Sequence, residues 1–192
     1  MTQFSQGRGR KFIKMRSLYC LALIQLVSVF GFAAQGETGK FDKLLSPFPG
    51  YHILTLDERD PETRAFLVQH FAKKNPSVIE ADFDGDGHLD YALLLKNAKT
   101  ANTKLVVLLC SSTLPCKSVY DLDLTGSAGE VYLKRIPAGA LVSQTEAVDT
   151  GENTIPVKLN SAGIRLVYFE KAEVVLYWDT KLGKIQEIQT GD

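Results

Sequence analysis

The chain has 192 residues, enough for one domain with a sizeable hydrophobic core. Its formal net charge is zero, but residues 1–33 hold five of its 22 basic residues and none of its 22 acidic ones, which leaves a net charge of −5 on the remainder. An acidic remainder is a poor electrostatic match for nucleic acid, so we expect no nucleic-acid partner.

Residues 1–33 have the pattern of a secretory signal peptide. Basic residues continue up to Arg16, and an apolar stretch follows over Leu18–Phe32, with small residues suited to cleavage after Ala33. We therefore expect a cleaved signal, a periplasmic or secreted mature protein, and no membrane span after cleavage. Met15 is a more ordinary start for such a signal. An uncleaved membrane anchor is the alternative, although the stretch is short for crossing a bilayer.

The next segment, residues 34–50, is polar and then rich in proline and glycine, which predicts a linker. Residues 51–192 are expected to form a single β-rich domain. Its predicted helix runs from Pro61 to Lys74, because Asp60 is a suitable N-cap before a proline at the first helical position. Pro76 then ends the helix, since the residue before a proline avoids the helical conformation.

Nine residues, Asp82–Asp90, concentrate four carboxylates and two glycines between two apolar runs. Like charges this close repel one another unless a cation neutralises them, and calcium accepts about 6–8 oxygen ligands in flexible geometry. The sequence therefore predicts a Ca²⁺ site. A solvated acidic turn without an ion and a site for another metal are the alternatives. The predicted metal ligands are Asp82, Asp84, Asp86, the backbone carbonyl of His88, and Asp90.

The residues that flank this loop alternate between apolar and polar, which is typical of strands rather than helices. The loop also differs from an EF-hand, which carries an acid at its twelfth position, because that position here is Leu93. We expect a β-hairpin over residues 77–96 with the ion at its turn.

The DxDxDGxxD pattern resembles the calcium loop of the FG-GAP/VCBS repeat. The matching residues are Asp82, Asp84, Asp86, Gly87 and Asp90. In that family the carboxylates bind calcium, and repeated copies build integrin-like β-propellers. This sequence has one copy and no internal repeat of about 20–50 residues, so we do not expect a propeller. The rest of the chain is similar to small exported proteins of unassigned function that end in an aromatic hairpin, here Tyr177-Trp178.

Further strands are predicted after the acidic hairpin, together with a long loop over residues 136–153. The predicted strands are 104–109, 118–124, 131–133, a hairpin of 163–170 with 173–179, and 184–188, with 154–159 as an edge strand if it is a strand at all. Short connections favour antiparallel pairing. The expected fold class is α+β, a mostly antiparallel curved β-sheet or half-open barrel with one helix packed on it and not a full propeller, with Trp178 in the core.

Cys110 and Cys116 are the only cysteines beyond the predicted signal. An oxidising compartment favours a disulfide between them. Two free thiols are the main alternative. A metal or redox pair is less consistent with the spacing, which is not CxxC and has no nearby histidine to complete a zinc site.

The sequence lacks a phosphate-binding glycine loop, HExxH and GxSxG. We therefore expect an exported calcium-binding, β-rich interaction protein without catalytic activity, in which calcium is mainly structural. Its expected partner is an unknown protein or glycan in the envelope or outside the cell. The alternative is a secreted hydrolase whose site is not recognisable from sequence. A deep acidic or histidine-containing cleft would favour the hydrolase, and a shallow aromatic surface would favour the binding protein.

Overall fold

The computed structural model describes residues 35–71, 75–112, 115–144 and 155–191. The chain divides into two units, Met1–Asp42 and Lys43–Asp192. Helix α1 (Gln35–Leu45) lies within the predicted linker and was missed by the sequence analysis. Two glycines lower its intrinsic helix propensity, which explains the miss. The predicted signal peptide lies outside the described residues.

Helix α2 (Pro61–His70) begins where the sequence predicts, with Asp60 as its N-cap residue and a proline in the first turn. The helix ends at His70, four residues before the predicted end, and Phe71 at the C-cap has left the helical conformation with φ −124°. Residues 72–74 of the predicted helix lie outside the described residues.

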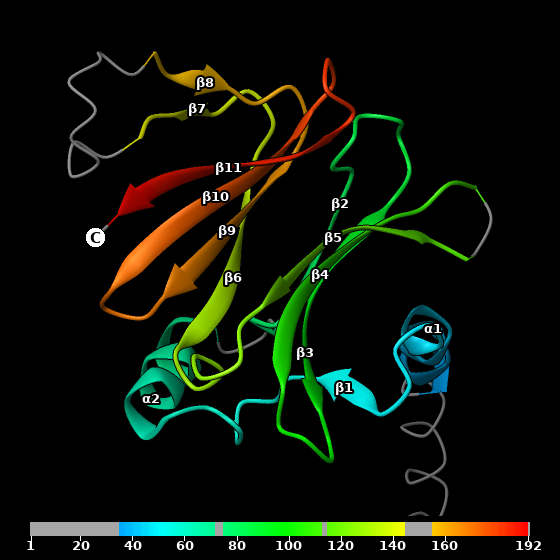
Figure 1. Ribbon diagram of the computed structural model, residues 1–192, viewed down its shortest axis with the longest axis vertical. Helices are drawn as coiled ribbons and strands as arrows, with labels where there is room; N and C mark the ends of the chain where they lie inside the picture. The colour runs from blue at the N-terminus through cyan, green and yellow to red at the C-terminus, as the bar shows by residue number, and fades with distance from the viewer. Residues whose placement is uncertain (1–34, 72–74, 113–114, 145–154, 192) are drawn as a thin grey trace, which may run out of the picture. The chain divides into compact units, whose positions relative to one another are not determined.

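Two antiparallel sheets make up most of the second unit (Figure 1). The first sheet has the order β1-β3-β4-β5, with β2 also paired to β3. Its strands are β1 (Tyr51–Ile53), β2 (Val78–Ala81), β3 (Asp90–Asn97), β4 (Thr103–Leu109) and β5 (Lys117–Asp123). The second sheet has the order β11-β10-β9-β6. Its strands are β6 (Val131–Ile136), β9 (Gly163–Tyr168), β10 (Ala172–Asp179) and β11 (Lys184–Gly191).

A short pair, β7 (Leu141–Val142) with β8 (Val157–Lys158), forms a separate two-stranded sheet. Strand β7 falls inside the long loop predicted for residues 136–153, and Ile136 itself still belongs to β6. A strand as short as β7 carries too few residues for an alternating pattern, so sequence periodicity could not detect it.

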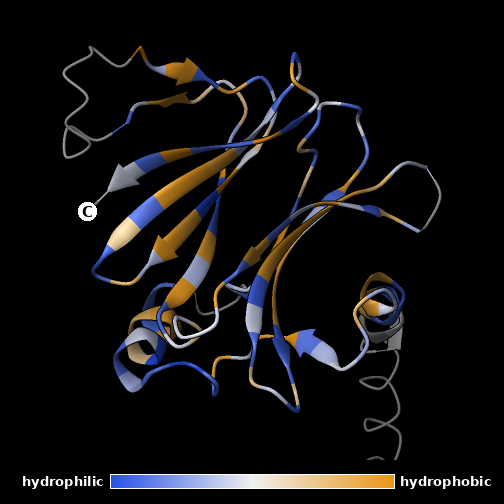
Figure 2. Ribbon diagram, viewed as in Figure 1, coloured by the Kyte–Doolittle hydropathy of each residue, from blue (hydrophilic) through white to orange (hydrophobic). Residues whose placement is uncertain are grey.

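The hydrophobic core lies between the two sheets, since one continuous cluster of buried side chains draws on both of them. Figure 2 shows hydrophobic residues concentrated along the strands, whereas the connecting loops are largely hydrophilic. From the first sheet the cluster includes Leu94 and Leu105, from the loop between β2 and β3 it includes Phe83, and from the second sheet it includes Leu166 and Leu176. Burial of this apolar surface is the main stabilising contribution to the unit.

The predicted fold class is confirmed: the protein is an α+β fold of mostly antiparallel sheets, and neither sheet closes into a barrel within the described residues. Helix α2 packs on the face of the second sheet that points away from the main core. There Leu67 is buried with Tyr132 of β6 and Val167 of β9. Trp178, predicted to be a core residue, is only half-buried and packs against the main core from outside it.

The predicted disulfide is also confirmed, since Cys110 and Cys116 are bridged. The bridge closes the connection between β4 and β5. No helix among the described residues is long and apolar enough to span a membrane.

Candidate metal centre

The acidic loop connects β2 to β3, as the alternating flanks predict, and the pairing of Ala81 with Asp90 closes the hairpin. Phe83 inserts its ring into the main core and is only 1% exposed, so it anchors the loop. Gly85 and Gly87 have φ of +85° and +86°, a left-handed conformation that favours glycine. The two glycines therefore allow the sharp turns between the aspartates.

Three of the predicted ligands converge at this turn. Asp82, Asp84 and Asp86 each offer a carboxylate oxygen, and these oxygens all lie within 4.8 Å of one another. The group is the only one of its kind that the described residues contain. A cluster made only of oxygen donors suits a hard cation such as Ca²⁺ rather than zinc, which prefers nitrogen and sulfur.

Backbone N–H groups of the loop hold these carboxylates in place. Asp82 accepts hydrogen bonds from the N–H of Gly85 at 2.6 Å and of Gly87 at 3.0 Å. Asp84 accepts one from the N–H of Asp86 at 3.1 Å, and Asp86 accepts one from the N–H of His88 at 2.8 Å. The carboxylates are thus oriented by the loop itself, and each oxygen keeps lone pairs that these bonds do not use.

The electrostatics of the loop reflect the crowding of negative charge. The pKa of Asp84 is raised, first by partial burial and then by the negative charges of Asp86 and Asp82. The pKa of Asp86 is lowered, mainly by the hydrogen bond from the backbone N–H of His88 and further by the His88 ring. A bound cation would relieve the repulsion between the carboxylates.

The other two predicted ligands have different surroundings. Asp90 is fully buried, and its two oxygens accept hydrogen bonds from the N–H of Phe83 and of Cys110, both at 2.8 Å. Burial is the main cause of its raised pKa. Asp90 therefore lies outside the group of three and supports the base of the loop. The His88 imidazole is exposed, and its Nδ1 lies 3.2 Å from Asp86 Oδ1.

The loop is tied to the second sheet by a residue that the sequence analysis did not single out. Ser161, just before β9, donates a hydrogen bond from its hydroxyl to the carbonyl of Phe83. The N–H of Ala162 donates to the carbonyl of Asp82 at 3.2 Å. No local pattern marks Ser161, because its role depends on the packing of segments about 80 residues apart in sequence.

Two hollows away from the loop bear on the alternative functions. One, of about 350 Å³, lies at the start of α2, and its lining includes Asp60, Glu62, Glu130, Glu170 and Lys171. Its Glu130 is paired with Lys171 at 2.6 Å. The other, of about 170 Å³, lies beside Tyr177 and Trp178, with polar groups from Lys158, Asn160 and residues 179–181.

No family model matches the chain, and no curated protein or solved structure was found to be similar to it.

Proposed function

We propose that this protein is an exported, calcium-binding, β-rich interaction protein without catalytic activity, in which calcium is mainly structural. The observation that carries the proposal is the convergence of Asp82, Asp84 and Asp86 within 4.8 Å on a loop preorganised by its own backbone. Three clustered carboxylates attract a divalent cation, and the exposed side of the loop leaves room for water to complete the coordination.

The structural role of calcium follows from where the loop is attached. Its backbone is bonded to Ser161 and Ala162 beside the second sheet, and its base is held by Asp90 to the N–H of Cys110 at the end of β4. An ion that binds only the folded loop must stabilise the folded protein. Calcium is a weaker Lewis acid than zinc, which favours stabilisation over catalysis.

The proposed export and the proposed class of partner are supported by observations outside the carboxylate cluster. The disulfide is compatible with an oxidising compartment and supports the proposed periplasmic or secreted location. The resemblance of the loop to the FG-GAP/VCBS repeat supports calcium binding. The hollow beside Tyr177 and Trp178 supports a binding role toward a protein or glycan, because such aromatic side chains are enriched in binding interfaces.

Thermal unfolding with excess calcium and with a chelator tests the metal site. We expect calcium to raise the melting temperature, with a dissociation constant of about 10⁻⁴ to 10⁻³ M, as in extracellular modules. Asp84→Ala should abolish the calcium-dependent increase. The matched control is Asp57→Ala, which removes an equal charge from a side chain that is 95% exposed and outside the loop. Equal melting temperatures in calcium and chelator, with no heat in a calorimetric titration, would overturn the proposal.

A secreted hydrolase is the second candidate, and the acidic hollow at the start of α2 is the observation that favours it. Hydrolysis of glycosides needs two carboxyl groups at a defined separation. Its Glu130 is already paired with Lys171, which leaves Asp60, Glu62 and Glu170 as the remaining acids. A panel of chromogenic glycosides and esters decides: turnover that Glu170→Gln abolishes would support a hydrolase, and no turnover would eliminate this candidate for those substrates.

A further inference from the structure

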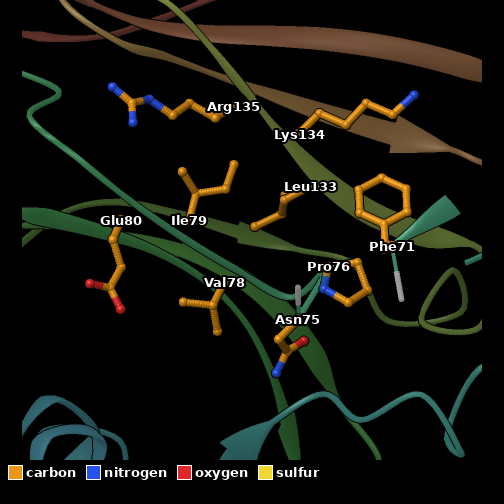
Figure 3. A pocket seen from close by; sticks show the side chains of 9 residues that line it. All are labelled: Phe71, Asn75, Pro76, Val78, Ile79, Glu80, Leu133, Lys134 and Arg135. Atoms are coloured by element: carbon orange, nitrogen blue, oxygen red, sulfur yellow. The ribbon is translucent and has the colours of Figure 1, made fainter. Parts of the chain in front are cut away.

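A third hollow, of about 370 Å³, lies where the edges of the two sheets approach each other. One wall comes from β2 and the other from β6, as Figure 3 shows. Each of these strands is paired on one side only, β2 with β3 and β6 with β9. At one end of the hollow, the N–H of Leu133 in β6 donates a hydrogen bond at 2.8 Å to the carbonyl of Pro76, just before β2.

The lining of this hollow is largely apolar. The apolar side chains are Phe71, Pro76, Val78, Ile79 and Leu133. Leu133 and Ile79 are buried members of the main core, so they form a rigid floor, whereas Phe71 and Val78 are half-buried. The volume falls at the low end of the range of about 300–1,000 Å³ for small-molecule sites.

Two cations from consecutive positions of β6, Lys134 and Arg135, complete that wall. In Figure 3 their side chains extend in opposite directions along the rim of the hollow. Within the described parts of the chain, neither forms an ion pair, although the Lys134 ammonium lies 5.2 Å from the centre of the Tyr132 ring. The surface arginines Arg64 and Arg165, by contrast, each face a carboxylate.

We propose that this hollow binds a small amphipathic carboxylate, a ligand with one carboxylate and an aliphatic body. The carboxylate would pair with Arg135, whose planar guanidinium can donate two parallel hydrogen bonds, and the charge of Lys134 would add to the attraction. The aliphatic body would lie against the floor formed by Ile79 and Leu133 and beside Val78. The charge of the lining favours an anionic ligand, since the lining contains two cations, Lys134 and Arg135, and one acid, Glu80.

This site lies apart from the acidic loop and does not depend on calcium. The probe is decanoate below its micelle concentration, with decylamine as the ligand of equal chain length and opposite charge. Titrations are run in chelator, because calcium would precipitate the carboxylate. We expect decanoate to shift the amide resonances of residues 78–80 and 133–135 and to bind at least about tenfold more tightly than decylamine.

The double variant Lys134→Gln/Arg135→Gln should weaken decanoate binding by at least about tenfold, because two favourable charges are lost. Val78→Asp should weaken it similarly by placing a negative charge in the apolar wall. The matched control is Lys184→Gln, which removes an exposed cation from β11 and should leave affinity within about twofold. Equal affinity for decanoate and decylamine, full binding by the double variant, or no shifts at these residues would each overturn the proposal.

Discussion

Among single residues, the burial of the charged Arg59 side chain is the least expected feature of the structure. Arg59 is 4% exposed, its Nη2 donates a hydrogen bond to the Ser77 hydroxyl, and no carboxylate of the described chain pairs with it. Its Nε and Nη1 have no hydrogen-bond partner within the described residues. Burial lowers its pKa to about 10, so the group is still charged at neutral pH. A buried, incompletely bonded cation costs stability.

Replacement of this residue gives a direct test. Arg59→Met keeps an unbranched side chain of similar length and removes the buried charge, and Ser77 keeps its hydrogen bond to the carbonyl of Leu54. We expect the free energy of unfolding in urea to rise by about 1–2 kcal/mol. Arg59→Ala should instead lower it, because a cavity remains. A loss of more than about 1 kcal/mol in Arg59→Met would show that the guanidinium has a bound water or ion as partner.

At this scale, sequence reasoning succeeded where the geometry is local. The spacing of Asp82, Asp84 and Asp86 around two glycines was enough to predict that their carboxylates converge. The inward turn of Asp90 was not predictable. It depends on the N–H of Cys110, which the pairing of β3 with β4 brings beside it. Sequence spacing carries no information on such a long-range contact.

Between elements, Glu58 links β1, β3 and the turn that follows β1. His52 Nε2 lies 3.0 Å from both of its oxygens, the N–H and hydroxyl of Thr55 donate to it, and Lys96 lies 3.3 Å away. Burial by itself would raise the pKa of Glu58, but the hydrogen bonds from Thr55, His52 and Lys96 outweigh it and lower the pKa from 4.5 to about 2.

The sign of the pH dependence follows from this depressed pKa. A carboxyl group whose pKa is lower in the folded state stabilises fully above its unfolded pKa, near 4.5, and loses that stabilisation as the pH falls toward 2. After allowance for solvent screening, we expect Glu58→Gln to cost about 1–2 kcal/mol at pH 6. The difference between wild type and variant should fall by roughly half by pH 3. A difference that is the same at both pH values would contradict the assignment.

Element prediction succeeded for strands with clear alternation and for the helix with a proline start. It missed α1, because the glycines and the prolines around that segment resemble those of a linker. It also missed β7 and gave no reason to expect its pairing with β8. Short elements depend on neighbours that pack against them more than on their own periodicity.

At the scale of the whole β-rich unit, the sequence predicted antiparallel pairing and a helix on one face but not the division into two sheets. That division depends on β6 pairing with β9 rather than with β5, the strand that precedes it in the chain. The sheets also meet at their other edge, where the Tyr120 hydroxyl donates a hydrogen bond to Glu187 at 2.7 Å. Burial is the main cause of the raised pKa of Tyr120, and this hydrogen bond raises it further. Strand order of this kind is set by packing across the core.

The acidic loop is a third place where the two sheets are joined, and Ser161 tests its contribution to global stability. Ser161→Ala removes the hydroxyl that donates to the Phe83 carbonyl in a buried position. We expect the free energy of unfolding to fall by about 1–2 kcal/mol, because a buried acceptor loses its partner. Ser46→Ala is the control, since its hydroxyl also donates to a backbone carbonyl, that of Lys43, but is exposed and should change stability by less than about 0.5 kcal/mol.

The same variant separates the loop's attachment from its metal. The hydroxyl of Ser161 bonds to loop backbone and not to the carboxylates, which accept hydrogen bonds from backbone N–H groups of the loop itself. The calcium-dependent rise in melting temperature should therefore persist in Ser161→Ala and vanish in Asp84→Ala. If Ser161→Ala also removed the calcium effect, attachment to the second sheet would be what shapes the carboxylate cluster, and the view that the loop orients its own ligands would be wrong.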